Sequence, residues 1–402
     1  MKEHPLPKAW KWMKLDEVCI ATKNRDPRIT PDLSFRYVDI SSVNNRLKRI
    51  IDTRTILGKD APSRARQIIK ANDVIVSMTR PNLNAVALVP EDLNNEICST
   101  GFCVLRPTEF IGALFLFEFV QSKYFIETVS GKVRGMLYPA ITDNQVREVN
   151  IPIPPLPEQK RIAIKTQELI QDVERARIAC EKQLEAAKAL SSAYLREVFE
   201  SEEAKKWEKK RLGQICYRII GGGTPSRGHS EYWGDPIYWL SPSELKENKI
   251  NYIKKTKEKI TEEGSRNSNA KLIPLKSVLL SCTASVGKVA INEVPLSTNQ
   301  QFNSFVLRDT IAIPEYIAYY LIYKRDDIKQ LGGKTTFTFI SKDEIANLLV
   351  FIPSLSIQHR IIVKLKEKMA QVEELRTGIE KQLESINALP QEILKKAFKG
   401  EL

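Results

Sequence analysis

The sequence predicts a mixed α/β protein: two globular domains joined by two long helices that form an antiparallel coiled coil. Three observations predict this pseudo-two-fold tandem repeat. The string EKQLE occurs at 181–185 and again at 380–384, 199 residues apart in a chain of 402 residues. Both copies lie in stretches whose apolar residues follow a heptad spacing. A region of short strand-like runs precedes each of these stretches, so the order is globular domain, helix, globular domain, helix.

The repeat extends well beyond EKQLE and sets the domain boundaries. IPPLPEQKRI at 153–162 matches IPSLSIQHRI at 352–361 at the same offset. The helical halves stay close in sequence, whereas the globular halves have diverged. The predicted segments are a first globular domain at 1–149, a first helical segment at 150–206, a second globular domain at 207–349 and a second helical segment at 350–402.

Each globular domain combines short strands with one helix. RYVDISS at 36–42 and DVIVSM at 73–78 are strand-like in the first domain, as are IYWLS and SVLLS in the second. Apolar stretches at 110–129 and 314–331 are each expected to form one helix. Because the strands are short and punctuated by Gly, Pro and Asn, a small, curved sheet is expected in each domain.

The helical segments carry the coiled-coil seam. Apolar residues recur at alternating spacings of four and three, which is typical of a heptad. The predicted seam consists of Val173, Ala176, Cys180 and Gln183 in the first copy and Val372, Leu375, Ile379 and Gln382 in the second. The two glutamines are expected to fix the register. Pro390 is expected to stop or kink the second helix, which leaves about 29 residues, or roughly 43 Å, of straight helix. An amphipathic helix packed on its own domain is the alternative.

Composition favours a cytoplasmic protein with a polyanionic partner. The net charge of +13 points to nucleic acid as the natural partner. The longest apolar stretch, at 110–120, is too short to span a bilayer, so no membrane partner is expected. The chain does not open with a signal-peptide pattern. Its six cysteines are scattered without a C-x-x-C pair, which predicts reduced cysteines and no zinc site.

Polar loops between the strands supply candidate DNA contacts. Arg and Lys can pair with guanine and Asn with adenine, while hydroxyls and backbone amides bind phosphate. In any single loop, Gly, Asn and Thr also serve simply to make the turn. The candidates are Arg80, Asn82, Asn84, Lys132, Arg134 and Tyr138 in the first domain and Thr224, Ser226, Arg227, Lys334, Thr335 and Thr336 in the second.

The sequence contains no recognisable catalytic machinery. Its only histidines are His4, His229 and His359, and GGKT at 332–335 lacks the earlier glycine of a phosphate-binding loop. No Asn/Asp-Pro-Pro-aromatic tetrapeptide of the kind used by amino-methyltransferases is present. The chain is therefore predicted to be non-catalytic, with no catalytic residues and no metal site.

Several motifs resemble one family. They are W-x4-L-x3-C near the start of each domain, GGTPSR followed by YW, LSTNQQF, PLPEQKRI and the terminal LKKAFKGEL. Over essentially the whole chain these motifs resemble the specificity subunits of type I restriction–modification systems. The second copy departs from the pattern, with Ile357 in the place of Glu158. A partner contact made through that glutamate is therefore in doubt in the second copy.

The resemblance implies a function and a set of partners. Each globular domain would be a target-recognition domain that reads one half of a bipartite double-stranded DNA target. The helices would form the spacer and dock two methyltransferase subunits, which bind S-adenosylmethionine. A translocating restriction subunit with ATP and Mg²⁺ could join, whereas this chain would bind no cofactor itself. The alternatives are a stand-alone DNA-binding protein and a coiled-coil scaffold that does not bind DNA.

Overall fold

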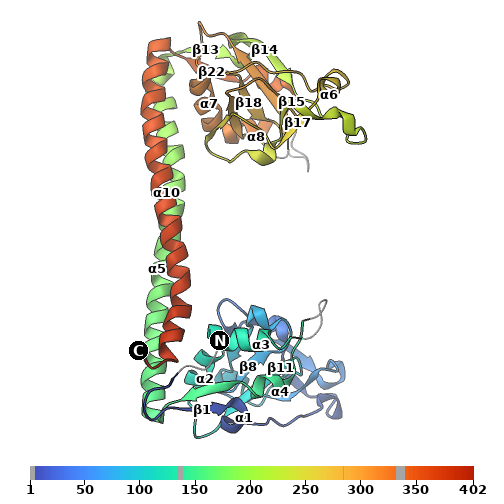
Figure 1. Cartoon of the computed structure of the whole chain (residues 1–402), viewed down its shortest axis with the longest axis vertical. Coiled ribbons are helices and arrows are strands. Elements are labelled where there is room, and N and C mark those ends of the chain that lie inside the picture. Colours follow the sequence, from blue (N-terminus) through green and yellow to red (C-terminus); the bar gives the residue numbers. More distant parts are fainter. Residues whose placement is uncertain (1–4, 134–138, 284, 332–339) are drawn as a thin grey trace. The chain divides into compact units, whose positions relative to one another are not determined.

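A computed structural model describes residues 5–133, 139–283, 285–331 and 340–402 and divides the chain into two compact units (Figure 1). Unit 1 comprises Met1–Glu181 and Lys381–Leu402, and unit 2 comprises Lys182–Glu380. Helices α5 (Leu156–Phe199) and α10 (Leu355–Ala397) are each shared between the units. Each unit therefore combines one globular domain with a part of both long helices.

Two four-stranded sheets form the globular domain of unit 1, in the orders β6-β3-β10-β7 and β2-β11-β8-β9. Two-stranded ladders β1-β12 and β4-β5 complete it. The strands are β1 Lys11–Lys14, β2 Cys19–Ile20, β3 Ser34–Val38, β4 Val43–Asn44, β5 Arg49–Ile50, β6 Arg54–Leu57, β7 Ala65–Ile68, β8 Val74–Ser77, β9 Val86–Leu88, β10 Ile97–Ser99, β11 Phe102–Pro107 and β12 Asn150–Ile153. The helices are α1 Leu15–Val18, α2 Ala113–Phe119, α3 Lys123–Ser130 and α4 Asp143–Arg147.

Unit 2 repeats this plan with a five-stranded sheet, β14-β21-β18-β19-β16, a three-stranded sheet, β17-β15-β20, and the ladder β13-β22. The strands are β13 Glu208–Arg211, β14 Cys216–Gly221, β15 Trp233–Leu240, β16 Ile250–Ile253, β17 Glu258–Ile260, β18 Val278–Ser281, β19 Val289–Asn292, β20 Leu296–Thr298, β21 Phe302–Leu307 and β22 Leu349–Ile352. The helices are α6 Glu262–Arg266, α7 Pro314–Tyr323, α8 Arg325–Leu331 and α9 Lys342–Ala346.

The central strand β8 is buried on both faces, which explains its continuous apolar run. Val74 and Val76 pack into the cluster that also contains residues of α2 and α3. Ile75, which points to the other face, packs into a second cluster with Phe102 and Val104. In unit 2, Val278, Leu280 and Leu279 of β18 divide between two clusters in the same way. Each domain contains two main sheets, rather than the single small sheet expected, and its central strand lies in one of them.

The single helix expected at 110–129 is two helices, α2 and α3. Ser122 separates them because its hydroxyl caps α3 by accepting a hydrogen bond from the N–H of Phe125 at 3.3 Å. The stretch at 314–331 likewise divides into α7 and α8. Apolar periodicity continues across both breaks, so the sequence pattern alone did not reveal them.

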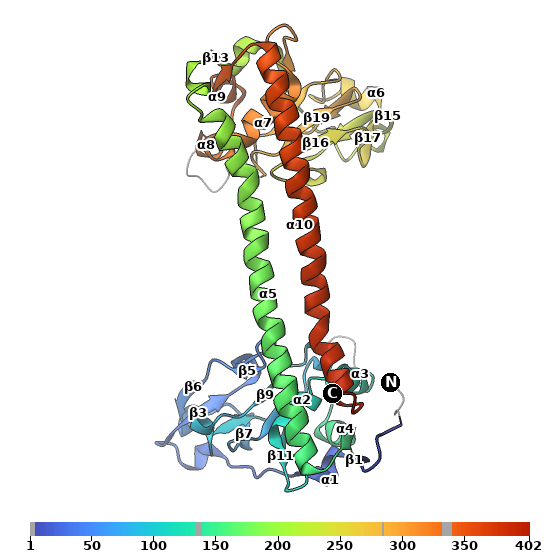
Figure 2. The same cartoon turned by 90° about the vertical axis from the view of Figure 1, so that its left-hand side faces the viewer.

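Helices α5 and α10 pack together antiparallel in each unit (Figure 2). Of the expected seam residues, Cys180, Val372 and Ile379 are buried and Val173 is half-buried. The expectation was wrong at Ala176, Gln183, Leu375 and Gln382, which are exposed. One residue further along, Leu184 and Leu383 are half-buried instead. The helices turn the larger apolar side chain inward at these positions, so the register is not set by buried amides.

Pro390 lies inside α10 and does not end it. The helices have 44 and 43 residues, longer than the 29 expected. The last turns of α10 bury Leu394 and Phe398 in the core of unit 1, where the rings of Phe398 and Phe115 lie 5.1 Å apart. Packing of this end against the domain offsets the backbone hydrogen bond that proline removes.

Candidate nucleic-acid interface

In unit 1 the loop that follows β8 lies against the segment that precedes α4. The N–H of Ile141 donates to the carbonyl of Met78 at 2.9 Å, and the N–H of Arg80 donates to Pro139 at 2.8 Å. Arg80 adopts a left-handed backbone conformation with φ of 48°. Its side chain and that of Asn82 are exposed. Two of the expected DNA contacts are therefore displayed together at the surface of one loop.

Two other candidates are engaged within the fold. Asn84 is buried, donates to the carbonyl of Val120 at 2.8 Å, and accepts from the ammonium of Lys48 at 2.8 Å. Lys132 is half-buried and donates to the carbonyl of Gln145 at 3.2 Å. Burial keeps the Asn84 amide from a base edge, and Lys132 has one of its three ammonium donors engaged within the domain. The remaining candidates in this domain, Arg134 and Tyr138, lie outside the described residues.

Unit 2 closes the corresponding loop with an equivalent hydrogen bond. The N–H of Ile340 donates to the carbonyl of Cys282 at 3.0 Å, in the place of the bond between Ile141 and Met78. This equivalence identifies the connection between β18 and β19 as the counterpart of the connection between β8 and β9, which the sequence comparison did not reveal. The candidates Lys334, Thr335 and Thr336 lie outside the described residues.

The glycine-rich loop of unit 2 is packed tightly against neighbouring backbone. A Cβ at Gly222 would lie 1.9 Å from the carbonyl oxygen of Asn299, and one at Gly223 would lie 2.4 Å from the backbone of Asn269. The indole N–H of Trp239 donates to the carbonyl of Gly223 at 3.0 Å. Glycine is therefore required here for close approach rather than for flexibility.

Beyond these glycines the loop carries its exposed polar candidates. The guanidinium of Arg227 stacks on Trp233 at 3.5 Å from the ring centroid and donates to Glu258 at 3.0 Å. The hydrogen bond to Arg227 lowers the pKa of Glu258. The indole of Trp233 donates to the carbonyl of Ser226 at 3.2 Å, and the hydroxyl of Thr224 bonds to Gln300. Arg227 is thus held in one orientation by an aromatic face and a carboxylate.

A hollow in unit 1 was not anticipated from the sequence. It measures about 390 Å³ and is lined by residues that include Tyr37, Asp39, Arg54 and Arg64. Arg54 pairs with Asp39 at 2.5 Å and lies over the ring of Tyr37 at 5.7 Å. Strands β3 and β6 bring these side chains together, and only their antiparallel pairing places Arg54 opposite Tyr37. The combination of a stacked arginine and a carboxylate matches that of Arg227 in unit 2.

The described residues hold no group of three or more His, Cys, Asp or Glu side chains that could bind a metal ion. All six cysteines, each within the described residues, are buried and form no disulfide there. Burial raises the pKa of Cys282 to about 11, so its thiol is not a ready nucleophile. Within the same part of the chain, no helix is both long and apolar enough to cross a membrane.

A family model assigns both units to one known domain. Residues 7–185 and 204–385 each match the type I restriction modification DNA specificity domain. The chain belongs to the type I restriction–modification specificity subunits. The two matches cover both globular domains and most of the helices, in agreement with the tandem repeat in the fold.

Relatives and solved structures agree with this assignment. The specificity subunit of MjaIX from Methanocaldococcus jannaschii is 29% identical over 48% of this chain and 44% of its own length. That of StySPI from Salmonella potsdam is 22% identical over 100% of this chain and 91% of its own. The crystal structure of the HsdS subunit from Thermoanaerobacter tengcongensis has a TM-score of 0.69 and 32% identity, covering 99% of both chains. A chain from a structural study of complex assembly and conformational transition of the type I R-M system has a TM-score of 0.88 and 33% identity over 100% of both.

Proposed function

We propose that this specificity subunit reads a bipartite DNA target with a fixed gap and docks two methyltransferase subunits. Each globular domain would recognise one half-site through the loops described above. The paired helices would hold the two domains apart and offer equivalent faces to the two partners. The chain itself would catalyse nothing and would work in the cytoplasm.

Two observations support this proposal: the long helices are joined to their domains in the same way in both units, whereas the loops of the two domains differ. Gln159 and Gln358 join the two long helices to their domains through equivalent hydrogen bonds. The equivalent loops differ: the loop after β8 exposes Arg80 and Asn82, whereas the loop after β18 contains neither arginine nor asparagine. Helices anchored in the same way can bind two copies of one partner. Loops that differ between the domains can recognise two different half-sites. The net charge of +13 suits contact with phosphate along both half-sites.

The partners would carry the chemistry. Methylation of adenine would use S-adenosylmethionine bound by the methyltransferase subunits, and a restriction subunit would bind ATP and Mg²⁺. Side chains in the specificity subunit would only position the DNA, through phosphate contacts and contacts to base edges.

Methylation mapping tests the proposal directly. The chain is co-expressed with its methyltransferase subunit in a host without other adenine methylation, and modified adenines are mapped by single-molecule sequencing. A single bipartite motif with a constant gap is the expected result. A stable complex that leaves the genome unmethylated, or methylation at a continuous motif, would contradict it.

A further inference from the structure

The hollow of unit 1 that contains Arg54 has a buried floor and a charged rim. Tyr37 and Ser99, which are buried, line its floor, and Asp39 beside them is half-buried. Arg54 and Arg64 are exposed at the rim. The guanidinium of Arg64 forms no hydrogen bond or ion pair with any residue that the structure describes. Two arginines are combined with one carboxylate, so the hollow has the surplus of positive charge that suits contact with nucleic acid.

Backbone hydrogen bonds join this hollow to the loop that exposes Arg80. The N–H of Thr100 donates to the carbonyl of Arg64 at 2.8 Å. The N–H of Met78, which directly follows β8, donates to the carbonyl of Gly101 at 2.9 Å. Thr100 and Gly101 form the turn between β10 and β11. The hollow and the loop after β8 therefore lie along one edge of the domain.

Unit 2 has an aromatic residue at the position of Tyr37. Tyr37 lies opposite Arg54, the first residue of β6, and Trp239 lies opposite Glu258, the first residue of β17. On its other side, each aromatic residue pairs with a parallel strand, β10 or β20. Both are 3% exposed. Trp239 is therefore the counterpart of Tyr37, and Glu258 is that of Arg54.

The two domains build the same arrangement from different residues. In unit 1, Arg54 begins its strand and lies over the ring of Tyr37, 5.7 Å from the centroid. In unit 2, Glu258 begins the equivalent strand, and Arg227 of the glycine-rich loop lies over the ring of Trp239 at 5.5 Å. Each of these arginines is paired with a carboxylate. The combination recurs although the arginine comes from a different segment in each domain.

Stability does not account for this recurrence. The side chain of Arg54 is 60% exposed and that of Arg227 is 57% exposed. Ion pairs as exposed as these contribute little to stability. The ring and the carboxylate instead fix the plane of the guanidinium, which bidentate pairing with a base edge requires, whereas a mobile lysine suffices for a phosphate. Arg54 uses one of its five N–H donors within the described residues and Arg227 uses two, so both keep donors for a base.

We propose that Arg54 is a specificity-determining residue that reads one guanine in the half-site of unit 1. Its guanidinium donates two hydrogen bonds to the O6 and N7 atoms of that guanine in the major groove, while Tyr37 and Asp39 hold its orientation. Asp39 does not read a base itself, because its oxygens already accept from Arg54 and from the backbone of Ser41 and Ser42. The inference rests on the proposed function and adds a contact from the sheet to those from the loops.

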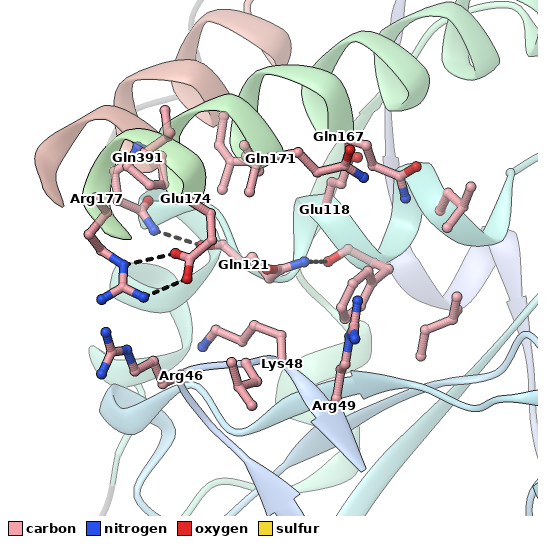
Figure 3. Close-up of a pocket in the computed structure, with 18 of the residues that line it drawn as sticks. Arg46, Lys48, Arg49, Glu118, Gln121, Gln167, Gln171, Glu174, Arg177 and Gln391 are labelled. Atoms are coloured by element: carbon pink, nitrogen blue, oxygen red, sulfur yellow. Dashed lines mark hydrogen bonds and ion pairs between the residues drawn. The ribbon is translucent and has the colours of Figure 1, made fainter. Parts of the chain in front are cut away.

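An ion-paired arginine elsewhere in unit 1 provides a matched control. Figure 3 shows Arg177 paired with Glu174 in the wall of a cavity of about 650 Å³. Arg177 donates to Glu174 at 2.8 Å and to Glu181 at 2.6 Å, and all three residues belong to α5. Its side chain is half-buried and does not line the hollow. Replacing Arg177 by lysine therefore changes a paired arginine without changing the hollow.

Duplex binding by the complex of this chain with its methyltransferase subunits tests the proposal, once the wild-type methylated motif has been mapped. Fluorescence anisotropy at one salt concentration compares the target duplex with duplexes in which each G·C pair of the motif is replaced in turn by A·T. Arg54→Lys keeps the positive charge but loses the paired donors, so the preference for guanine should fall about tenfold at one position and persist at the others. Arg177→Lys should leave the preference unchanged at every position.

Three results would overturn the proposal while the proposed function stands. An equal loss of affinity for every duplex in Arg54→Lys would assign Arg54 to a phosphate. Unchanged affinities for all duplexes would show that its ion pair is purely structural. A bipartite motif without a G·C pair in either half-site would leave Arg54 no guanine to read. A wild-type complex that methylates no bipartite motif would instead contradict the proposed function, and this inference with it.

Discussion

Gln159 and Gln358 make the same three hydrogen bonds in the two units. The side-chain oxygen of Gln159 accepts from Gly112 at 2.8 Å, and its amide donates to Phe110 and Pro154 at 2.9 Å. Gln358 accepts from Ile313 and donates to the carbonyls of Ile311 and Pro353, each at 2.9 Å. Both glutamines are essentially buried. One side chain therefore ties the start of each long helix to the start of the helix beneath it.

Replacing either glutamine should destabilise its unit by a similar amount. Gln159→Leu removes three hydrogen bonds at once and leaves one N–H and two carbonyls unpaired in a largely buried setting, at a cost of about 2–4 kcal/mol. Gln358→Leu should behave alike, because its bonds are equivalent. Urea denaturation of the purified chain measures both effects. Glu158→Ala is the matched control, since Glu158 pairs with Arg161 at the surface and should contribute less than about 1 kcal/mol. Equal effects of Gln159→Leu and Glu158→Ala would contradict the anchoring role.

The position of the seam can be tested by alanine substitution in pairs. Leu184→Ala and Leu383→Ala should each lower the free energy of unfolding by about 1–2 kcal/mol, because they remove half-buried methyl groups. Gln183→Ala and Gln382→Ala, one residue earlier on the exposed side, should change it by less than about 0.5 kcal/mol. Thermal or urea unfolding monitored by circular dichroism makes the comparison. A larger loss of stability in the glutamine variants than in the leucine variants would show that Gln183 and Gln382 do belong to the seam.

The seam illustrates how far the sequence predicts this structure. A heptad pattern locates the helices and correctly identifies Cys180 and Ile379 as buried. It does not distinguish Gln183 from Leu184, because both fit a spacing of three or four and the helix itself repeats every 3.6 residues. The apolar runs of β8 and β18 were sufficient to predict these two strands. The division of 110–129 into two helices depends on the cap at Ser122, a local signal within a continuous apolar pattern.

The candidate interface was less predictable, because its contacts join distant parts of the chain. Asn84 looks like a loop residue available to DNA, yet Lys48 and Val120 use its side chain. Nothing near Glu118 in the sequence signals that Thr166 will face it. From the sequence, Arg227 looks free to contact a base, but in the structure its guanidinium stacks on Trp233. The residue types were sufficient to predict which loops could contact DNA. Only the fold shows which of their side chains are not already bound to other parts of the chain.

Glu118 should make the stability of unit 1 dependent on pH. Its pKa in the folded protein, about 9, lies above the ordinary carboxyl value of 4.5. Between about pH 5 and pH 9 the folded protein therefore holds a proton that the unfolded chain releases, so stability falls as the pH rises. The slope is at most about 1.4 kcal/mol per pH unit. Denaturation at several values below about pH 8 should show this fall in the wild type and a weaker one in Glu118→Gln.

The pH range of that experiment is set by Lys48. Its lowered pKa of about 8 has the opposite effect, because the folded protein then holds fewer protons than the unfolded chain as the pH rises from about 8 towards 10.5. Measurements above about pH 8 would combine the two trends. Identical slopes for the wild type and Glu118→Gln below that value would show that Glu118 is already ionised in the folded protein.

Gly222 and Gly221 form a matched pair for testing the glycine-rich loop. An added Cβ at Gly222 would meet the carbonyl of Asn299 at 1.9 Å, whereas one at Gly221 meets nothing within 4 Å. Gly222→Ala should therefore displace the loop that carries Thr224 and Arg227, and Gly221→Ala should not. If unit 2 reads a half-site, methylation by the complex should fall about tenfold or more in the Gly222→Ala variant only. Unchanged methylation in the Gly222→Ala variant would show that this loop does not take part in DNA recognition.

The spacing between half-sites should follow the length of the paired helices. Inserting four residues within 184–188 of one helix should break the pairing. The reason is that the buried positions recur every seven residues, at Cys180 and Ala187 and again at Ile379 and Ile386. Repeating residues 181–187 in α5 and 380–386 in α10 preserves that period and adds about 10 Å to both helices. At about 3.4 Å per base pair, the gap in the methylated motif should grow by about three base pairs. Insertion into α5 alone should instead disrupt the pairing and abolish methylation. A double insertion that methylates the original motif would mean that the DNA gap is set elsewhere than in the helices.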